Sequence, residues 1–322
     1  MQRLILILFI ASELCYYLLI AQTGVVEYFS SNLFLIAPLP IGGIIGSLLV
    51  SYIKIDFKNK ISLFLTIQLI MSFLYPNFNM ITLFILGFAV GSLAPLIINE
   101  IKKTTLLELG LALSVSYVTG TLLFNYEVDA RGIIAISLTT ITLIASRFLP
   151  TNEPIKKSNQ EFALLMMVLW VFLDSTLFES LSRDITISIW RDGFTFQIAL
   201  FHVIGVFCAL YFKIEKNQKS LFILTLFAAS YLFYFLREGF ILSIVYPFVI
   251  SYYNVVILQT IAKKDFKTIT FYMIFIGWMA SGAGLFVALS NLILFVPIIL
   301  LLAIFKIMLS EYKPNNKEIK YV

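Results

Sequence analysis

Charged side chains are scarce in this chain of 322 residues. Asp, Glu, Lys and Arg make up 13% of it, against roughly a quarter in soluble proteins, while hydrophobic residues make up 60%. This deficit of charge excludes a soluble globular protein. Apolar stretches of roughly 17 to 22 residues recur along the chain, each long enough to cross a hydrocarbon core about 30 Å thick. Because lipid offers no partner to open backbone groups, these stretches are predicted to be helices.

Cysteine and histidine are also rare, and their positions exclude several kinds of site. Cys15 and Cys208 lie inside apolar stretches without metal-ligand or redox spacing around them, so both are interpreted as packing residues. His202 is the only histidine, which excludes a multi-histidine metal site. The chain has no Gly-rich loop that ends in Lys-Ser or Lys-Thr, which argues against an ATP-driven pump. We therefore expect neither a metal nor a cofactor.

The apolar stretches are bounded by charges, Pro, Gly or Asn, and they predict about twelve transmembrane helices. The net charge of the chain is +5. Its basic residues stand singly or in pairs between the apolar stretches, so no nucleic-acid partner is expected. The predicted spans are 4–22, 33–53, 61–76, 79–98, 105–124, 132–149, 162–181, 194–212, 220–236, 239–261, 268–289 and 292–309.

The distribution of basic residues predicts the topology, because Lys and Arg collect on the cytoplasmic side of membrane proteins. With the N-terminus inside, 19 of the 23 Lys and Arg residues fall on the cytoplasmic side. Only Arg131, Arg183, Arg191 and Arg237 fall outside. We therefore expect a multi-pass protein of the inner (cytoplasmic) membrane, with both termini in the cytoplasm.

An internal repeat divides the predicted helices six and six. The segment YIKIDFKNK at 52–60 follows the second span, and YFKIEKNQK at 211–219 follows the eighth, 159 residues later. Glu13 and Asp174 also correspond, at a separation of 161 residues. The polar segment 151–161 is interpreted as a cytoplasmic linker between an N-terminal bundle, 1–150, and a C-terminal bundle with a short tail, 162–322.

Two six-helix halves, a mid-chain linker and a repeated basic loop together resemble the major facilitator superfamily of secondary transporters. In that family the loop after span two usually carries Gly-x-x-x-Asp-Arg/Lys-x-Gly-Arg/Lys-Arg/Lys. In this chain Gly46 matches the first glycine of the motif, but Val50 occupies the position of its Asp. The resemblance implies an all-α fold of two pseudo-symmetric bundles. Similar charges at displaced positions are expected to form a gating loop, namely Asp56, Lys58, Lys60, Glu215 and Lys219.

Glycine placement follows the same pattern. Spans three, six, nine and twelve have no interior glycine, and the resemblance implies that these helices are peripheral. Spans two, four, five, eight and eleven are glycine-rich, and the resemblance implies that they form the contact between bundles and line a cavity. The alternative is that transmembrane helices simply tolerate glycine. The glycines concerned are Gly42, Gly43, Gly46, Gly87, Gly91, Gly110, Gly120, Gly205, Gly277, Gly282 and Gly284.

Ionisable residues near the bilayer centre are functional candidates because an exposed charge there is costly. Glu13, Asp174 and His202 fall near mid-depth, and Tyr16 and Tyr17 share the expected helical face of Glu13. The resemblance implies that Glu13 and Asp174 carry protons. The alternative is a permanently protonated carboxyl in an interhelical hydrogen bond. For His202, a packing role and a role as relay or substrate contact both stay open.

Aromatic and polar residues of the later spans complete the candidate site. Tyr253 and Asn254 in span ten and Trp278 in span eleven are expected to line a pocket for an organic solute. The predicted function is transport of a small molecule by a monomer, with possible proton coupling and without enzymatic activity. The alternatives are a lipid-modifying enzyme, whose site would be the external segment 179–192, and a non-transporting receptor or assembly factor.

Overall fold

The computed structural model describes residues 2–29, 33–150, 160–184 and 186–312, and this part of the chain is helical with no strand. The first half consists of α1 (Gln2–Tyr16), η1 (Tyr17–Gly24), α2 (Val25–Tyr28), α3 (Leu33–Ile36), α4 (Pro38–Leu49), α5 (Phe57–Ser72), α6 (Met80–Ile101), α7 (Leu106–Leu123), η2 (Val128–Ala130) and α8 (Arg131–Arg147). The second half consists of α9 (Leu164–Arg183), α10 (Thr195–Tyr211), α11 (Lys216–Phe235), α12 (Gly239–Ile261), α13 (Phe266–Met273), η3 (Ile274–Ala280), α14 (Ser281–Leu289), η4 (Ile293–Phe295) and α15 (Val296–Tyr312).

Each of the twelve predicted spans corresponds to one helical rod. Eight rods within the described residues are long and apolar enough to cross a membrane, and three more are apolar but shorter. The remaining rod is α5, which carries Lys58, Lys60 and Gln68 and is less apolar than its neighbours. The chain is therefore a multi-pass membrane protein, and the predicted all-α membrane fold is confirmed.

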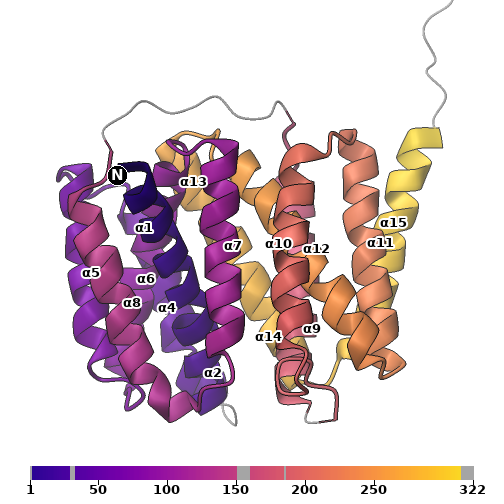
Figure 1. Cartoon of the computed structure of the whole chain (residues 1–322), viewed down its shortest axis with the longest axis horizontal. Coiled ribbons are helices and arrows are strands. Elements are labelled where there is room, and N and C mark those ends of the chain that lie inside the picture. The colour runs from indigo at the N-terminus through magenta and orange to yellow at the C-terminus, as the bar shows by residue number, and fades with distance from the viewer. Residues whose placement is uncertain (1, 30–32, 151–159, 185, 313–322) are drawn as a thin grey trace, which may run out of the picture.

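The two halves repeat the same helix contacts. In the first half α4 packs on α6, α5 on α6 and α8, and α1 on α7. The corresponding contacts in the second half join α10 to α12, α11 to α12 and α15, and α9 to α14. One contact differs: α8 packs along α1, whereas α15 packs mainly on α11 and stands at the edge of the molecule (Figure 1).

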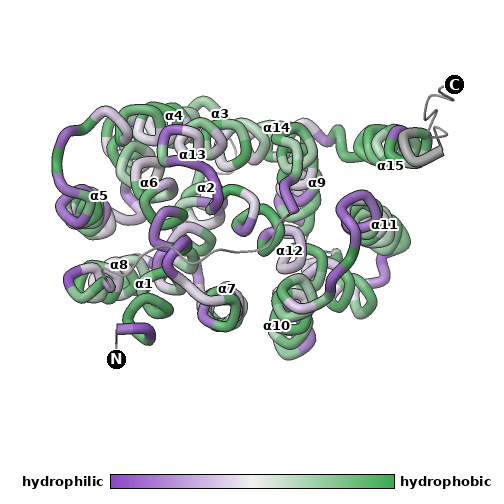
Figure 2. The backbone as a smooth tube through the Cα atoms, turned by 90° about the horizontal axis from the view of Figure 1, so that it is seen from above, coloured by the Kyte–Doolittle hydropathy of each residue, from purple (hydrophilic) through white to green (hydrophobic). Residues whose placement is uncertain are grey.

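Figure 2 places α5 and α8, which have no interior glycine, at one edge of the molecule and α11 and α15 at the other. The predicted division at 151–161 stays a prediction, because residues 151–159 lie outside the described part. The predicted tail 313–322 also lies outside it. At the end of the linker, Gln160 Nε2 donates to Ile214 O at 2.6 Å, and Lys264 pairs with Glu161 at 2.6 Å.

Glycines allow the closest helix contact in each half. A Cβ atom on Gly87 of α6 would lie 2.0 Å from Leu39 O of α4, and one on Gly91 would lie 2.2 Å from Gly43 O. In the second half, a Cβ atom on Gly205 of α10 would lie 2.5 Å from Phe248 O of α12. These backbones approach so closely that no side chain fits between them.

Several helix contacts join the halves, and glycine takes part in two of them. Helix α7 packs on α10, and α4 packs on α13 and η3. Gly110 of α7 faces Leu210 of α10, and Gly43 of α4 faces the ring of Trp278. The predicted packing role of glycine is therefore confirmed at these positions. It is wrong for Gly282, whose surroundings are open.

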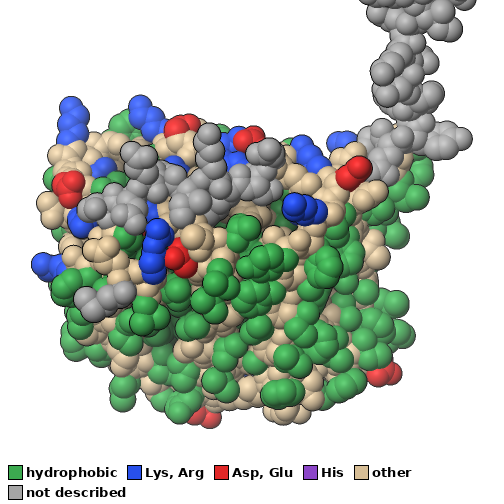
Figure 3. Space-filling model, turned by 45° about the horizontal axis from the view of Figure 1, so that its top comes forward, with side chains coloured by type: hydrophobic (Ala, Val, Ile, Leu, Met, Phe, Trp, Pro, Cys, Tyr) green, Lys and Arg blue, Asp and Glu red, His purple; other side chains and the backbone are tan. Residues whose placement is uncertain are grey.

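Apolar and basic side chains occupy different parts of the surface. In Figure 3 apolar side chains cover the flank of the molecule, while Lys and Arg gather around the top. The N-terminus and the last turn of α15 lie at this same end (Figure 1), which we call the terminal end. Its assignment to the cytoplasm stays a prediction.

Candidate functional site

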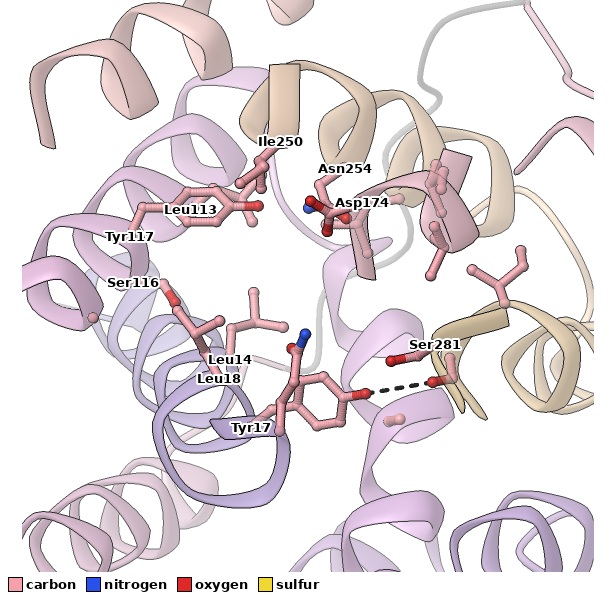
Figure 4. A pocket seen from close by; sticks show the side chains of 18 of the residues that line it. Leu14, Tyr17, Leu18, Leu113, Ser116, Tyr117, Asp174, Ile250, Asn254 and Ser281 are labelled. Atoms are coloured by element: carbon pink, nitrogen blue, oxygen red, sulfur yellow. Dashed lines mark hydrogen bonds between the residues drawn. The ribbon is translucent and has the colours of Figure 1, made fainter. Parts of the chain in front are cut away.

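A cavity of about 230 Å³ lies between the two halves. Its wall comes from α1, η1, α6 and α7 of the first half and from α9, α10, α12, α13, η3 and α14 of the second. The wall is mostly aliphatic and aromatic, with a polar part that includes Glu13 and Asp174. The predicted acids therefore line one shared space, and they come from helices that correspond in the two halves. Figure 4 shows Asp174 on this wall.

Asp174 is held by two tyrosines of α12. Tyr253 Oη donates a hydrogen bond to Asp174 Oδ2 at 2.6 Å, and Tyr246 Oη donates to Oδ1 at 2.8 Å. Tyr246 was not among the predicted site residues, although its position seven residues before Tyr253 places both on one helical face. That spacing is the signal that identifies Tyr246 from the sequence.

Glu13 is held by a single amide. Gln68 Nε2 of α5 donates to Glu13 Oε2 at 3.1 Å, and it also contacts Thr139 Oγ1 of α8 at 3.2 Å. Sequence reasoning missed Gln68, whose only signal is that it is a polar residue in the middle of an apolar span. Neither Glu13 nor Asp174 forms an ion pair with a basic side chain of the described residues.

The sequence places Tyr16 and Tyr17 on the helical face of Glu13, but neither hydroxyl donates to Glu13. The Tyr16 hydroxyl lies 3.1 Å from Ser72 Oγ of α5, so this side chain points away from the cavity. Tyr17 lines the cavity, but its hydroxyl donates to Gly277 O at 3.5 Å, as the dashed line in Figure 4 shows. Glu13 and Tyr17 do line the same cavity, as a spacing of four residues predicts, but α5 and η3 supply other partners for the two hydroxyls.

His202 and Asn254 both line the cavity. The His202 ring stacks on Tyr117 of α7 with a centroid distance of 4.5 Å, and its Nδ1 lies 2.6 Å from Ser251 Oγ. Figure 4 shows Tyr117 pointing toward Asn254 and Asp174. His202 of α10 therefore contacts both α7 and α12 at the polar part of the wall.

Trp278 is not part of the cavity wall, so the prediction that it lines the pocket is wrong. Its ring fills the space above Gly43, and its Nε1 donates to Ser47 Oγ at 3.3 Å. Ser47 in turn donates to Gly91 O at 2.8 Å. Trp278 therefore joins η3 to the α4–α6 pair.

An aromatic cluster closes the cavity at the end remote from the termini. Trp190, in the segment between α9 and α10, packs on Phe124, Phe178 and Tyr246 with centroid distances of 5.3, 5.0 and 6.2 Å. Beside this cluster, Arg191 pairs with Glu27 of α2 at 2.5 Å. This arrangement ties the segment 186–192 to the first half of the chain.

Four charged residues of the segment proposed for lipid chemistry form ion pairs, namely Glu179, Arg183, Asp184 and Arg191. Glu179 pairs with Arg183 at 3.4 Å, and Asp184 pairs with Arg237. Burial alone would raise the pKa of Asp184, but hydrogen bonds from Thr186 and Arg237 outweigh it, so the pKa is lowered. These ion pairs indicate a structural role for the segment.

The predicted gating residues lie at the terminal end, away from the cavity wall. Asp56 caps α5 by accepting from Lys58 N at 3.1 Å, and Lys60 Nζ donates to Val50 O at 3.1 Å. In the second half Lys219 is likewise buried, but Glu215 makes no side-chain cap bond to α11. Asp56 and Lys60 stabilise the start of α5, and the gating role of all five residues stays a prediction.

The described residues contain no group of three or more His, Cys, Asp or Glu side chains that could hold a metal ion. The polar wall of the cavity offers carboxyl, phenol, amide and imidazole groups. These groups suit hydrogen bonding to a small organic molecule and proton exchange.

Comparison with known proteins identifies the fold. No family model and no curated protein sequence matches the chain. Among solved structures, it is similar to FucP, a major facilitator superfamily transporter in the outward conformation, with a TM-score of 0.56 and 12% identity over 92% of this chain and 97% of that one. It is also similar to a variant of the E. coli fucose:proton symporter FucP, with a TM-score of 0.51 and 12% identity over 92% and 96% of the two chains. The chain therefore has the major facilitator superfamily fold, as predicted.

Proposed function

We propose that this protein is a secondary transporter, which moves a small solute across the membrane as a monomer by alternating access. The observation that carries the proposal is the cavity between the halves, in which Glu13 and Asp174 come from corresponding helices. This location suits a small solute, because side chains of both bundles can contact a solute that is bound there.

Proton coupling follows from the surroundings of the two acids. A charge buried away from water is costly unless a counter-charge or a proton compensates for it. The groups that face Asp174 are Tyr246 and Tyr253, and the group that faces Glu13 is Gln68. None of these supplies a positive charge, so proton binding compensates each carboxylate. We infer that proton binding biases which side of the cavity is open.

The two ends of the cavity support alternating access. The remote end is closed by Trp190 and by the Arg191–Glu27 pair. Toward the terminal end, the wall is aliphatic and includes Ile97, Ile101 and Ile261. Rocking of the halves about the α7–α10 and α4–η3 contacts would separate Trp190 from Phe124, because these residues belong to different halves.

Fucose:proton symport is the activity named for one of the similar structures. We carry over proton coupling, which the buried acids support, and we do not carry over the sugar. The wall around the acids is largely aliphatic and aromatic, so it is suited to a solute with an apolar part.

The test uses the purified full chain in proteoliposomes with an imposed pH gradient. A panel of organic solutes is applied, and charge movement or uptake is recorded for the wild type, Glu13→Gln and Asp174→Asn. We expect gradient-driven movement of at least one solute, and loss of its dependence on the gradient in each variant. Gradient-driven uptake that stays unchanged in both variants contradicts the proposal. Lipid turnover in detergent without solute movement favours the enzyme alternative instead.

A further inference from the structure

The cavity wall has an uneven balance of charge. Two of its residues are acidic, Glu13 and Asp174, and none of its described residues is Lys or Arg. The one remaining ionisable base is His202, whose Nδ1 is used by Ser251 at 2.6 Å. An anionic solute would meet two carboxyl groups and no permanent positive charge. The wall therefore disfavours anions.

Asp174 presents a carboxylate whose position is fixed. Both oxygens accept tyrosine hydroxyls, and its backbone oxygen accepts from Tyr246 at 3.0 Å. Tyrosine hydroxyls orient a carboxylate without neutralising it. A positively charged group that enters the cavity would supply the missing counter-charge.

Aromatic and aliphatic groups surround this carboxylate. Tyr117 and Tyr253 bring their rings to the wall near Asp174, and Trp190 closes the space at the remote end. Aromatic faces attract organic cations, particularly quaternary ammonium groups, through the ring quadrupole. Leu14, Leu18 and Ile250 lie on the same wall (Figure 4) and suit an apolar body attached to the cation.

We propose that the solute bound in this cavity is an organic cation with an apolar body, whose charge is paired with Asp174. This inference rests on the proposed transport function, which it deepens by naming the substrate class. A neutral solute would form no charge pair with Asp174 and would leave its compensation to a proton, and a small inorganic cation would leave the aliphatic and aromatic wall unused. An organic cation uses both features of the site.

The test measures binding to the purified full chain in detergent at pH 8. The probes are benzyltrimethylammonium, neutral benzyl alcohol and anionic benzylsulfonate, which share the same ring and differ in charge. We expect the cation to bind at least tenfold more tightly than either control by calorimetry, and to raise the melting temperature. Equal or tighter binding of the alcohol or the sulfonate overturns the proposal. This charge series uses only the wild type, so it does not depend on the folding of a variant.

Variants locate the binding. We expect Asp174→Asn to weaken binding of benzyltrimethylammonium by at least tenfold. Tyr252→Phe is the matched control, because Tyr252 neighbours Tyr253, is absent from the wall, and has a buried hydroxyl with no hydrogen-bond partner among the described residues. It should bind as the wild type does. Cation binding that is unchanged in Asp174→Asn overturns the assignment to this residue.

Failure of the inference and failure of the transport proposal give different results. Gradient-driven uptake of a neutral solute, without preferential cation binding, overturns the substrate class and leaves the transporter intact. Cation binding that depends on Asp174, without movement of any cation into proteoliposomes, supports the binding site and contradicts transport.

Discussion

The two acids of the cavity occupy corresponding helices but are held differently. Glu13 in the first half accepts one hydrogen bond from an amide, that of Gln68 on α5. Asp174 in the second half accepts two from hydroxyls, those of Tyr246 and Tyr253 on α12. The helix contacts repeat between the halves, whereas the polar contacts do not. The halves thus share a scaffold and differ in the chemistry that they bring to the cavity.

This difference assigns separate tasks to the two acids. Asp174 is fixed from two directions and lies near Tyr117 and Asn254, so it is suited to orient a solute (Figure 4). Glu13 has a single partner and therefore more freedom to exchange a proton. The experiments below test the comparison between the halves.

The largest effect is expected from neutralising the acids. Glu13→Gln and Asp174→Asn should each abolish the dependence of uptake on the pH gradient, because neither amide takes up a proton. Asp174→Asn should in addition lower uptake without a gradient by tenfold or more, since it removes the charge that orients the solute. Uptake into proteoliposomes with and without a gradient separates these effects. Identical behaviour of the two variants in both conditions would contradict the separate tasks.

A large loss of stability is expected from Gly87→Ala. The new Cβ atom would lie 2.0 Å from Leu39 O, so α4 and α6 must move apart, at a cost of about 3 kcal/mol. Gly205→Ala in the second half should cost less, because the corresponding distance is 2.5 Å. Gly282→Ala is the control, since nothing lies near its added methyl group. Thermal unfolding in detergent should rank the three in this order, and a Gly87→Ala variant as stable as Gly282→Ala refutes the close contact.

A smaller loss is expected from removing one hydroxyl at Asp174. Tyr253→Phe deletes the hydrogen bond to Oδ2 and should lower the free energy of unfolding by about 1.5 kcal/mol, typical of a buried bond to a charged group. Tyr252→Phe removes a hydroxyl that has no partner among the described residues, so it should be neutral. Equal melting temperatures of the two variants would show that the bond to Asp174 contributes nothing to stability.

The smallest effect concerns corresponding helix caps at the terminal end. The N-cap side chain of α7 is the uncharged Thr105, which forms a capping box with Glu108, whereas Asp265 caps α13 by accepting from Thr268 N at 3.0 Å. Side-chain and backbone hydrogen bonds from Thr268 lower the pKa of Asp265 below its usual 3.8. The stabilising contribution is therefore present above pH 3.8 and is lost as the pH falls through the lower folded-state pKa.

Asp265→Asn tests this cap, because Asn is also a good helix cap and does not titrate. Between pH 6 and pH 3 the melting temperature of the wild type should fall slightly more than that of the variant. If the melting temperatures of the two proteins fall in parallel over this range, the charge of Asp265 does not stabilise the cap.

The order and composition of the helices follow from the sequence alone. Apolar length predicts twelve rods, and interior glycines occur in α4, α6, α7 and α10 but not in the edge helices α5, α8, α11 and α15. Both properties are local, because a helix must satisfy its own backbone in lipid wherever it lies. The candidate acids are also visible, since Glu13 and Asp174 interrupt apolar stretches.

The partners of these acids are decided only by the tertiary structure. The pairing of Gln68 with Glu13 depends on how α5 approaches α1, and the position of Trp278 depends on the space above Gly43. Spacing along the chain places Tyr17 on the wall with Glu13, but only the approach of η3 decides that its hydroxyl donates to Gly277 O. Hydropathy and periodicity describe each helix separately. The relative rotation and approach of two helices depend on packing between residues far apart in sequence, and these determine which polar groups meet.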